Sequence, residues 1–350
     1  MTSTPSAPAS VRPREKARLV DKPPTRSVRY HITPLPYMDV DDDGASINNR
    51  GQVVSDSFLW YNGHLRVLLA PKTAYAGEHT SAHGINDAGI IVGEARGDSP
   101  GAYTQFYGQA VVWHGAKGQE LPVRSLGDTI AYAINNTGVI VGQAYGIMPV
   151  QDESTFQAFL LRHGKGVFLK ARKPICINNR GQVLVDAGSS TLYSSYDAPT
   201  HFMLLSRGKR VPIKNARTGA EFGDAVAMND AGVVVGAIGN NACLWRQGHV
   251  TKLGRLSGTQ VDPAAINNQG QVVGKAEIKP CKPLAPDDTP ETHAFVWQHG
   301  RMIDLNYLVS RKSGWVLYGA AAINDRGQIV CWGNKAACLL TPMPHAAKLR

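Results

Sequence analysis

Two side chains that can transfer protons near neutral pH, His83 and Tyr132, stand at equivalent places in this chain. Each lies two residues before a copy of a repeated phrase, which begins at Ile85 in one case and at Ile134 in the other. An imidazole and a phenol act as general base and acid when a substrate brings the reacting proton within hydrogen-bond reach. These two residues are therefore the catalytic candidates if the protein is an enzyme.

Other side chains near the repeats, or in the long segments between them, could bind a ligand. Charged groups before the phrase can bind polar groups, and aromatic groups on loops can stack on sugar rings or anchor a protein partner. A solvated strand rim and local packing of long loops would explain the same residues without a ligand. The ligand-binding candidates are Asp43, His79, Lys173, Asp224, Asp262, Tyr107, Tyr193, Trp315 and Tyr318.

Metal and nucleophile motifs are incomplete in this sequence. Residues 39–44 match the opening D-x-D-x-D-G of a calcium loop, but Arg50 occupies the twelfth position, where an acid is needed. Residues 97–101 fit G-x-S-x-G without the strand-to-helix context of a nucleophile elbow. On a strand, His79 and His83 would lie ~13 Å apart, too far to share a metal. The five cysteines have neither disulfide nor zinc spacing, so we predict no metal and no cofactor.

The phrase that positions these candidates reads Ile-Asn-(Asn/Asp)-x-Gly-(Gln/apolar)-(Val/Ile). A period near 40 residues with irregular insertions is typical of β-repeat arrays, most often propellers. Each repeat divides into four short apolar stretches of strand length, and the phrase itself predicts a type I turn closed by a glycine at positive φ. The seven copies begin at Ile47, Ile85, Ile134, Ile177, Met228, Ile266 and Ile323.

The ends of the chain indicate how the array closes. The last repeat has three predicted strands, and residues 28–35 resemble the missing fourth. Pairing them would remove the exposed edges of an open β array. We therefore predict an all-β fold over residues 28–345: a seven-bladed β-propeller with four antiparallel strands per blade, closed by an N-terminal strand. Residues 1–27 are expected to be a disordered tail, and the variable loops on one face are expected to carry function.

The repeat unit A-x-x-I-N-x-x-G-x-V-V-G … H-A-F-x-W-x-x-G resembles that of the HAF-repeat family of bacterial proteins, often described as extracellular repeats. The tripeptide is intact at residues 293–295, and degenerate copies begin at Gln109, Gln157 and Asn241. The resemblance covers about residues 40–341. It implies the propeller fold and no shared catalytic motif.

Composition restricts partners and location. The net charge is +10, but half of the excess lies in residues 1–30 and no Lys/Arg cluster follows, so nucleic-acid binding is not expected. No apolar stretch reaches the ~18 residues of a membrane span, and residues 1–30 lack the apolar core of a secretory signal. We expect a monomer located in the cytoplasm, or exported without a Sec signal peptide.

Three functional hypotheses remain open. The first is a recognition module that binds a small molecule, a glycan or a protein through the variable-loop face and the channel mouth. The second is an enzyme of bacterial specialised or carbohydrate metabolism, with His83 and Tyr132 as acid–base residues at the channel mouth. The third is a secreted effector whose tail is an export leader and whose propeller binds a host protein.

Overall fold

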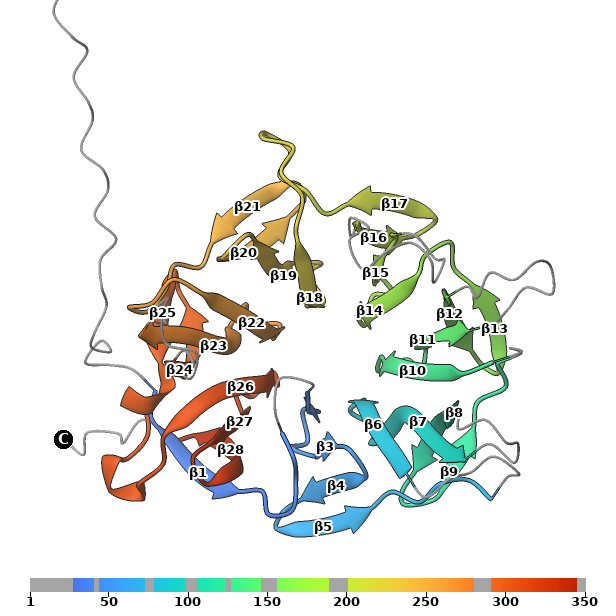
Figure 1. Cartoon of the computed structure of the whole chain (residues 1–350), viewed down its shortest axis with the longest axis horizontal. Coiled ribbons are helices and arrows are strands. Elements are labelled where there is room, and N and C mark those ends of the chain that lie inside the picture. Colours follow the sequence, from blue (N-terminus) through green and yellow to red (C-terminus); the bar gives the residue numbers. More distant parts are fainter. Residues whose placement is uncertain are drawn as a thin grey trace, which may run out of the picture.

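The strands of this protein form a closed ring of seven four-stranded antiparallel sheets in the computed structural model (Figure 1). The predicted seven-bladed propeller is therefore confirmed. The described part of the chain contains 28 strands and two short 3-10 helices. The structure describes residues 28–40, 44–72, 79–98, 106–123, 127–145, 156–188, 201–279 and 291–344.

Each of the first six blades consists of four consecutive strands, with the first strand beside the central channel (Figure 1). Blades 1 to 3 are β2 (Ser46–Ile47), β3 (Val53–Ser55), β4 (Phe58–Tyr61), β5 (His64–Val67); β6 (His79–Ile85), β7 (Ile90–Asp98), β8 (Phe106–His114), β9 (Gly118–Glu120); and β10 (Thr129–Ile134), β11 (Ile140–Tyr145), β12 (Phe156–Arg162), β13 (Lys165–Phe168). Blades 4 to 6 are β14 (Lys173–Ile177), β15 (Val183–Asp186), β16 (Phe202–Ser206), β17 (Lys209–Pro212); β18 (Asp224–Met228), β19 (Val234–Ile238), β20 (Asn241–Arg246), β21 (His249–Lys252); and β22 (Val261–Ile266), β23 (Val272–Lys279), β24 (Glu291–Gln298), β25 (Arg301–Asp304).

Blade 7 joins the two ends of the chain. Its strands β26 (Leu317–Ile323), β27 (Ile329–Gly333) and β28 (Ala336–Pro342) are completed by β1 (Tyr30–Pro34), as the sequence predicts. Between blades 6 and 7 lie the 3-10 helices η1 (Leu305–Tyr307) and η2 (Arg311–Ser313). Because β1 pairs along the outer edge of β28, this blade has four strands like the others, and the pairing of the two chain ends closes the ring.

The apolar core lies between neighbouring blades. The namesake tripeptide shows why, because successive residues of a strand face opposite sides of the sheet. Ala294 packs in the cluster shared by blades 6 and 7, whereas Phe295 packs in the cluster shared by blades 5 and 6. Both are fully buried. The Nδ1 atom of His293 lies 2.6 Å from the Oδ2 atom of Asp304, so the polar member of the tripeptide has a partner within its own blade.

The first Asn of each repeat phrase does more than make a turn. Its Oδ1 accepts a backbone N–H from four residues ahead; for Asn229, both Ala231 and Val233 donate at 3.1 Å. Its Nδ2 donates to the carbonyl oxygen of the corresponding Asn in the next blade, which for Asn229 is Asn267 at 3.1 Å. Seven such bonds form a circle that closes where Asn324 donates to Asn48 at 2.9 Å.

The residue after each of these asparagines takes part in a second circle of hydrogen bonds. The backbone N–H of each following residue donates to a side-chain oxygen of its counterpart in the next blade, and all seven distances are 2.8 Å. The glycine of the phrase has φ between 71° and 83° in all seven turns, as the turn prediction requires. The repeated phrase therefore both turns the chain and joins the blades at one end of the channel.

Candidate functional site

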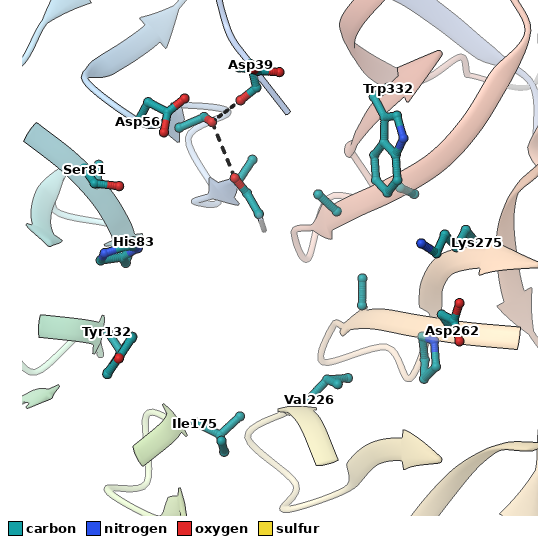
Figure 2. A pocket seen from close by; sticks show the side chains of 18 of the residues that line it. Asp39, Asp56, Ser81, His83, Tyr132, Ile175, Val226, Asp262, Lys275 and Trp332 are labelled. Atoms are coloured by element: carbon teal, nitrogen blue, oxygen red, sulfur yellow. Dashed lines mark hydrogen bonds between the residues drawn. The ribbon is translucent and has the colours of Figure 1, made fainter. Parts of the chain in front are cut away.

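A cavity of about 730 Å³ occupies the other end of the channel (Figure 2). Every blade contributes to its wall the residue two positions before the phrase. In blades 2 to 7 this residue is the extra one in a β-bulge, which leaves it without a partner in the ladder between the first two strands. The seven residues are Ala45, His83, Tyr132, Ile175, Val226, Ala264 and Ala321.

His83 belongs to a compact group of ionisable side chains from blades 2 and 3. Its Nε2 lies 3.6 Å from Oε1 of Glu94, beyond hydrogen-bond length, and its ring centroid lies 5.8 Å from that of Tyr132. Arg96 contacts the same Glu94 oxygen at 2.8 Å. Burial by itself would raise the pKa of Glu94, but His83 and Arg96 outweigh it and lower the pKa. The buried carboxylate is therefore kept ionised behind the imidazole.

Tyr132 connects this group to blade 4. Its hydroxyl donates to Oε1 of Gln143 at 3.2 Å. Burial, followed by the negative charge of Glu94, raises the pKa of Tyr132 to about 12, so the phenol stays protonated and can donate a hydrogen bond. The Nζ atom of Lys173 lies 4.6 Å from the centroid of the Tyr132 ring, a cation–π contact. Burial, with Arg172 nearby, lowers the pKa of Lys173.

The opposite part of the wall carries carboxylates and a second lysine. Burial, together with the negative charge of Asp262, raises the pKa of Asp224. Asp262 pairs in register with Lys275 across β22 and β23, and both line the cavity. The Nε2 atom of Gln260 donates to the two oxygens of Asp262 at 3.1 and 3.2 Å. This side therefore presents hydrogen-bond acceptors and an ammonium donor next to each other.

Three wall residues, Asp56, Lys275 and Trp332, escaped the sequence analysis because they lie on the second strand of a blade or just after it. They belong to a row at the ninth position after the first residue of the phrase. Where this row pairs with the first strand, as Lys275 does with Asp262, it lies directly across from the residue four positions before the phrase. Reading this position in all repeats would have found them. In blade order the row is Asp56, Glu94, Gln143, Asp186, Ala237, Lys275 and Trp332.

The predicted ligand-binding residues divide between the cavity and other places. Asp224 and Asp262 line the cavity, and Lys173 lies behind Tyr132. His79 is exposed at the start of β6, Tyr318 is 41% exposed, and neither lines the cavity. Trp315 packs against the core between blades 6 and 7, which gives it a packing role.

Three further predicted residues cannot be placed in the site. Asp43 and Tyr193 lie outside the described residues, and so does the side chain of Tyr107, whose backbone belongs to β8. The described residues contain no group of three or more His, Cys, Asp or Glu side chains that could hold a metal ion. In the same part of the chain, no helix is long and apolar enough to cross a membrane.

Comparison with known proteins assigns the chain to no family. No family model matches the chain, and no curated protein matches its sequence. Among solved structures, it is similar to the WD40 β-propeller domain of Doa1, with a TM-score of 0.49, 11% identity and coverage of 92% of this chain and 99% of that one. It is also similar to the extracellular domain of a putative hybrid two-component system from B. thetaiotaomicron, with a TM-score of 0.47, 9% identity and coverage of 91% and 40%.

Proposed function

We propose that this propeller is a recognition module that binds a small polar ligand in the channel-mouth cavity. The contrast between the two ends of the channel carries this proposal. At one end every blade contributes the same asparagine-based turn, whereas at the cavity every blade contributes a different combination of side chains. A scaffold alone needs no such variety, and a cavity with a few convergent polar groups is the usual form of a ligand site.

The charged groups at the cavity favour the same proposal. Asp224 and Asp262 both line the cavity, and burial together with the negative charge of Asp262 raises the pKa of Asp224. A ligand whose hydroxyl groups donate hydrogen bonds to these carboxylates would stabilise their charged forms. The cavity volume of about 730 Å³ is also within the roughly 300–1,000 Å³ of small-molecule sites.

The test is a thermal-shift screen of the full chain against a library of small polar metabolites and sugars. A ligand that binds the folded state raises Tm, and the increase follows its concentration relative to Kd. We expect the shift to disappear in Ala264→Leu, which fills part of the cavity, and to persist in His79→Ala, which changes an exposed residue outside it. A ligand that shifts both variants equally would place binding elsewhere and contradict the proposal.

One observation favours a catalytic alternative. Nε2 of His83 is buried without a hydrogen-bond partner and lies 3.6 Å from the ionised carboxylate of Glu94, and the imidazole ring packs 5.8 Å from the ring of the protonated Tyr132. This arrangement provides a base oriented by Glu94 and an acid in Tyr132. Any ligand found in the screen should then be converted by catalytic amounts of protein, as followed by NMR, and His83→Gln should abolish turnover while Tm is retained. Quantitative recovery of the unchanged ligand would exclude catalysis on it.

A further inference from the structure

The wall of the cavity has small side chains on one side and larger ones on the other. Among the seven residues that stand two positions before the phrase, those of blades 2 to 5 are the larger His83, Tyr132, Ile175 and Val226. Those of blades 6, 7 and 1 are all alanine: Ala264, Ala321 and Ala45. A ligand therefore has most space in front of three neighbouring blades, opposite the His83 and Tyr132 side of the wall (Figure 2).

An indole ring forms the wall at the middle of this space. Trp332 lies on β27, directly across from Gly319 on β26. A Cβ atom added to Gly319 would lie 2.1 Å from Cζ2 and 2.2 Å from Cη2 of this indole, so the ring rests against the glycine backbone. The remaining surface of the half-buried indole lines the cavity. The glycine thus holds a flat apolar surface at a fixed place.

Polar groups stand on both sides of this indole (Figure 2). Asp262 and Lys275 come from blade 6, and Asp39 and Asp56 lie on the side of blade 1. A flat apolar surface next to hydrogen-bond donors and acceptors suits a sugar ring, which has an apolar face of C–H groups and an edge of hydroxyls. Neither a purely apolar ligand nor a flat ion uses both features.

Charge narrows the class of ligand further. The described wall residues include four carboxylates, those of Asp39, Asp56, Asp224 and Asp262, against the ammonium of Lys275 and the imidazole of His83. An anionic ligand would be repelled by this excess of negative charge. A cation stacked on the indole would meet the neighbouring ammonium of Lys275. A neutral polyol avoids both penalties and can still bind carboxylates and ammonium through its hydroxyls.

We propose that the cavity binds a neutral saccharide whose ring stacks on Trp332 and whose hydroxyls contact Asp262 and Lys275. This inference rests on the proposed recognition function and names the ligand class for the same cavity. The space provided by Ala264, Ala321 and Ala45 is the part of the wall that admits the sugar.

The experiment measures binding of the full chain to a panel of trisaccharides by saturation-transfer NMR and calorimetry. The panel contains neutral members (maltotriose, cellotriose, xylotriose and triacetylchitotriose) and an acidic one, trigalacturonic acid. We expect at least one neutral member to bind and the acidic member to bind at least tenfold more weakly. Trp332→Ala should weaken binding tenfold or more, Trp332→Phe should retain most of it, and Tyr318→Ala, which removes an exposed aromatic outside the cavity, should have no effect.

Trp332 also packs against the apolar core, so its replacement by alanine could unfold blade 7. Ala321→Leu therefore serves as a second variant, because it fills the hollow in front of the indole and leaves the indole itself in place. Loss of binding in Ala321→Leu supports the inference. Binding of no neutral member, preference for the acidic one, or equal binding by wild type and Ala321→Leu would overturn it. If a ligand that is not a saccharide binds and is blocked by Ala264→Leu, the recognition function stands and the saccharide class fails.

Discussion

The two ends of the channel are built from the same seven first strands, yet one end repeats a single pattern and the other varies in every blade. At the turn end, each Asn donates to the equivalent Asn of the next blade, so a change in one blade removes a bond from its neighbour. At the cavity end, the bulge row has no partners in the ladder. A bulge residue can therefore be replaced without the loss of a hydrogen bond between the first two strands, and this allows the cavity end to differ from blade to blade.

Even the uniform end has an internal order. Its second circle, formed by the residue after each turn asparagine, contains three aspartates, and no two of them are adjacent. In a circle of seven positions, three is the largest number that can be separated in this way. Each aspartate Oδ2 accepts a hydrogen bond from an asparagine on either side, as Asp325 does from Asn49 and Asn268. In blade order the circle is Asn49, Asp87, Asn136, Asn179, Asp230, Asn268 and Asp325.

The strongest test of the comparison removes one turn-end asparagine. Asn229→Ala takes away the acceptor of two backbone N–H groups and the donor to Asn267, in a position only 6% exposed. We expect a loss of about 3 kcal/mol in the free energy of unfolding, because buried donors are left unpaired. Urea denaturation measures it. His79→Ala at the other end should cost under about 0.5 kcal/mol. Equal losses in the two variants would remove the distinction between the ends.

A smaller loss of stability is expected for a substitution where the cavity wall is tightly packed. Gly319→Ala places a methyl group 2.1 Å from the indole of Trp332, and such overpacking costs about 1–3 kcal/mol. The displaced ring should also change the near-ultraviolet circular dichroism. Gly223→Ala is the matched control, because its Cβ would meet no atom closer than 4.0 Å. An unchanged spectrum and stability for Gly319→Ala would show that the indole does not rest on this glycine.

Because the aspartates are separated, placing a further carboxylate between two of them should lower the free energy of unfolding in a charge-dependent way. Asn268→Asp puts a carboxylate between Asp230 and Asp325 and removes the two Nδ2 bonds to them, at 2.9 Å each. The two neighbouring carboxylates would raise the pKa of the new carboxyl group in the folded state. A loss of about 1 kcal/mol in the free energy of unfolding should therefore appear as pH rises through this folded-state pKa, and should vanish below the pKa that the group has in the unfolded chain. Stability measured from pH 3 to pH 7 tests this.

Asn179→Asp supplies the matched control for the spacing. Its new carboxylate would have one aspartate neighbour, Asp230, in place of two. The pH-dependent loss should therefore be about half as large as for Asn268→Asp. The same loss in both variants would mean that the separation of aspartates has no energetic role.

The smallest expected change in stability comes from replacing a carboxylate of the cavity. Burial and Asp262 raise the pKa of Asp224, so its ionisation costs stability: the contribution is present below the unfolded pKa and is lost as pH rises through the folded pKa. Asp224→Asn should therefore gain about 0.3 kcal/mol at pH 7, since solvent screens this exposed group, and gain nothing near pH 3. Lower stability of the variant at pH 7 would show that Asp224 stabilises the fold.

The sequence predicts the turns and strands within each repeat, but it does not predict the contacts between residues of different strands and repeats. The turn at Asn229 and Gly232 follows from residues three positions apart, and the closing strand β1 follows from a count of strands. The bond from Asn229 to Asn267 spans 38 residues and needs the ring geometry. The place of His83 two residues before the repeated phrase predicted a position at the channel mouth, but Glu94, 3.6 Å from its Nε2, lies on the next strand.

In blades 2 to 7 a bulge places one residue of the first strand at the cavity, so the chemistry of the cavity can change one blade at a time. Each of these residues lies on a separate strand and lacks a ladder partner, so its replacement leaves the hydrogen bonds of the sheet in place. A duplicated ancestor with seven identical blades could therefore diversify its ligand preference through single substitutions, one blade at a time. In this chain blades 6, 7 and 1 carry alanine at this place, and blades 2 and 3 carry an imidazole and a phenol.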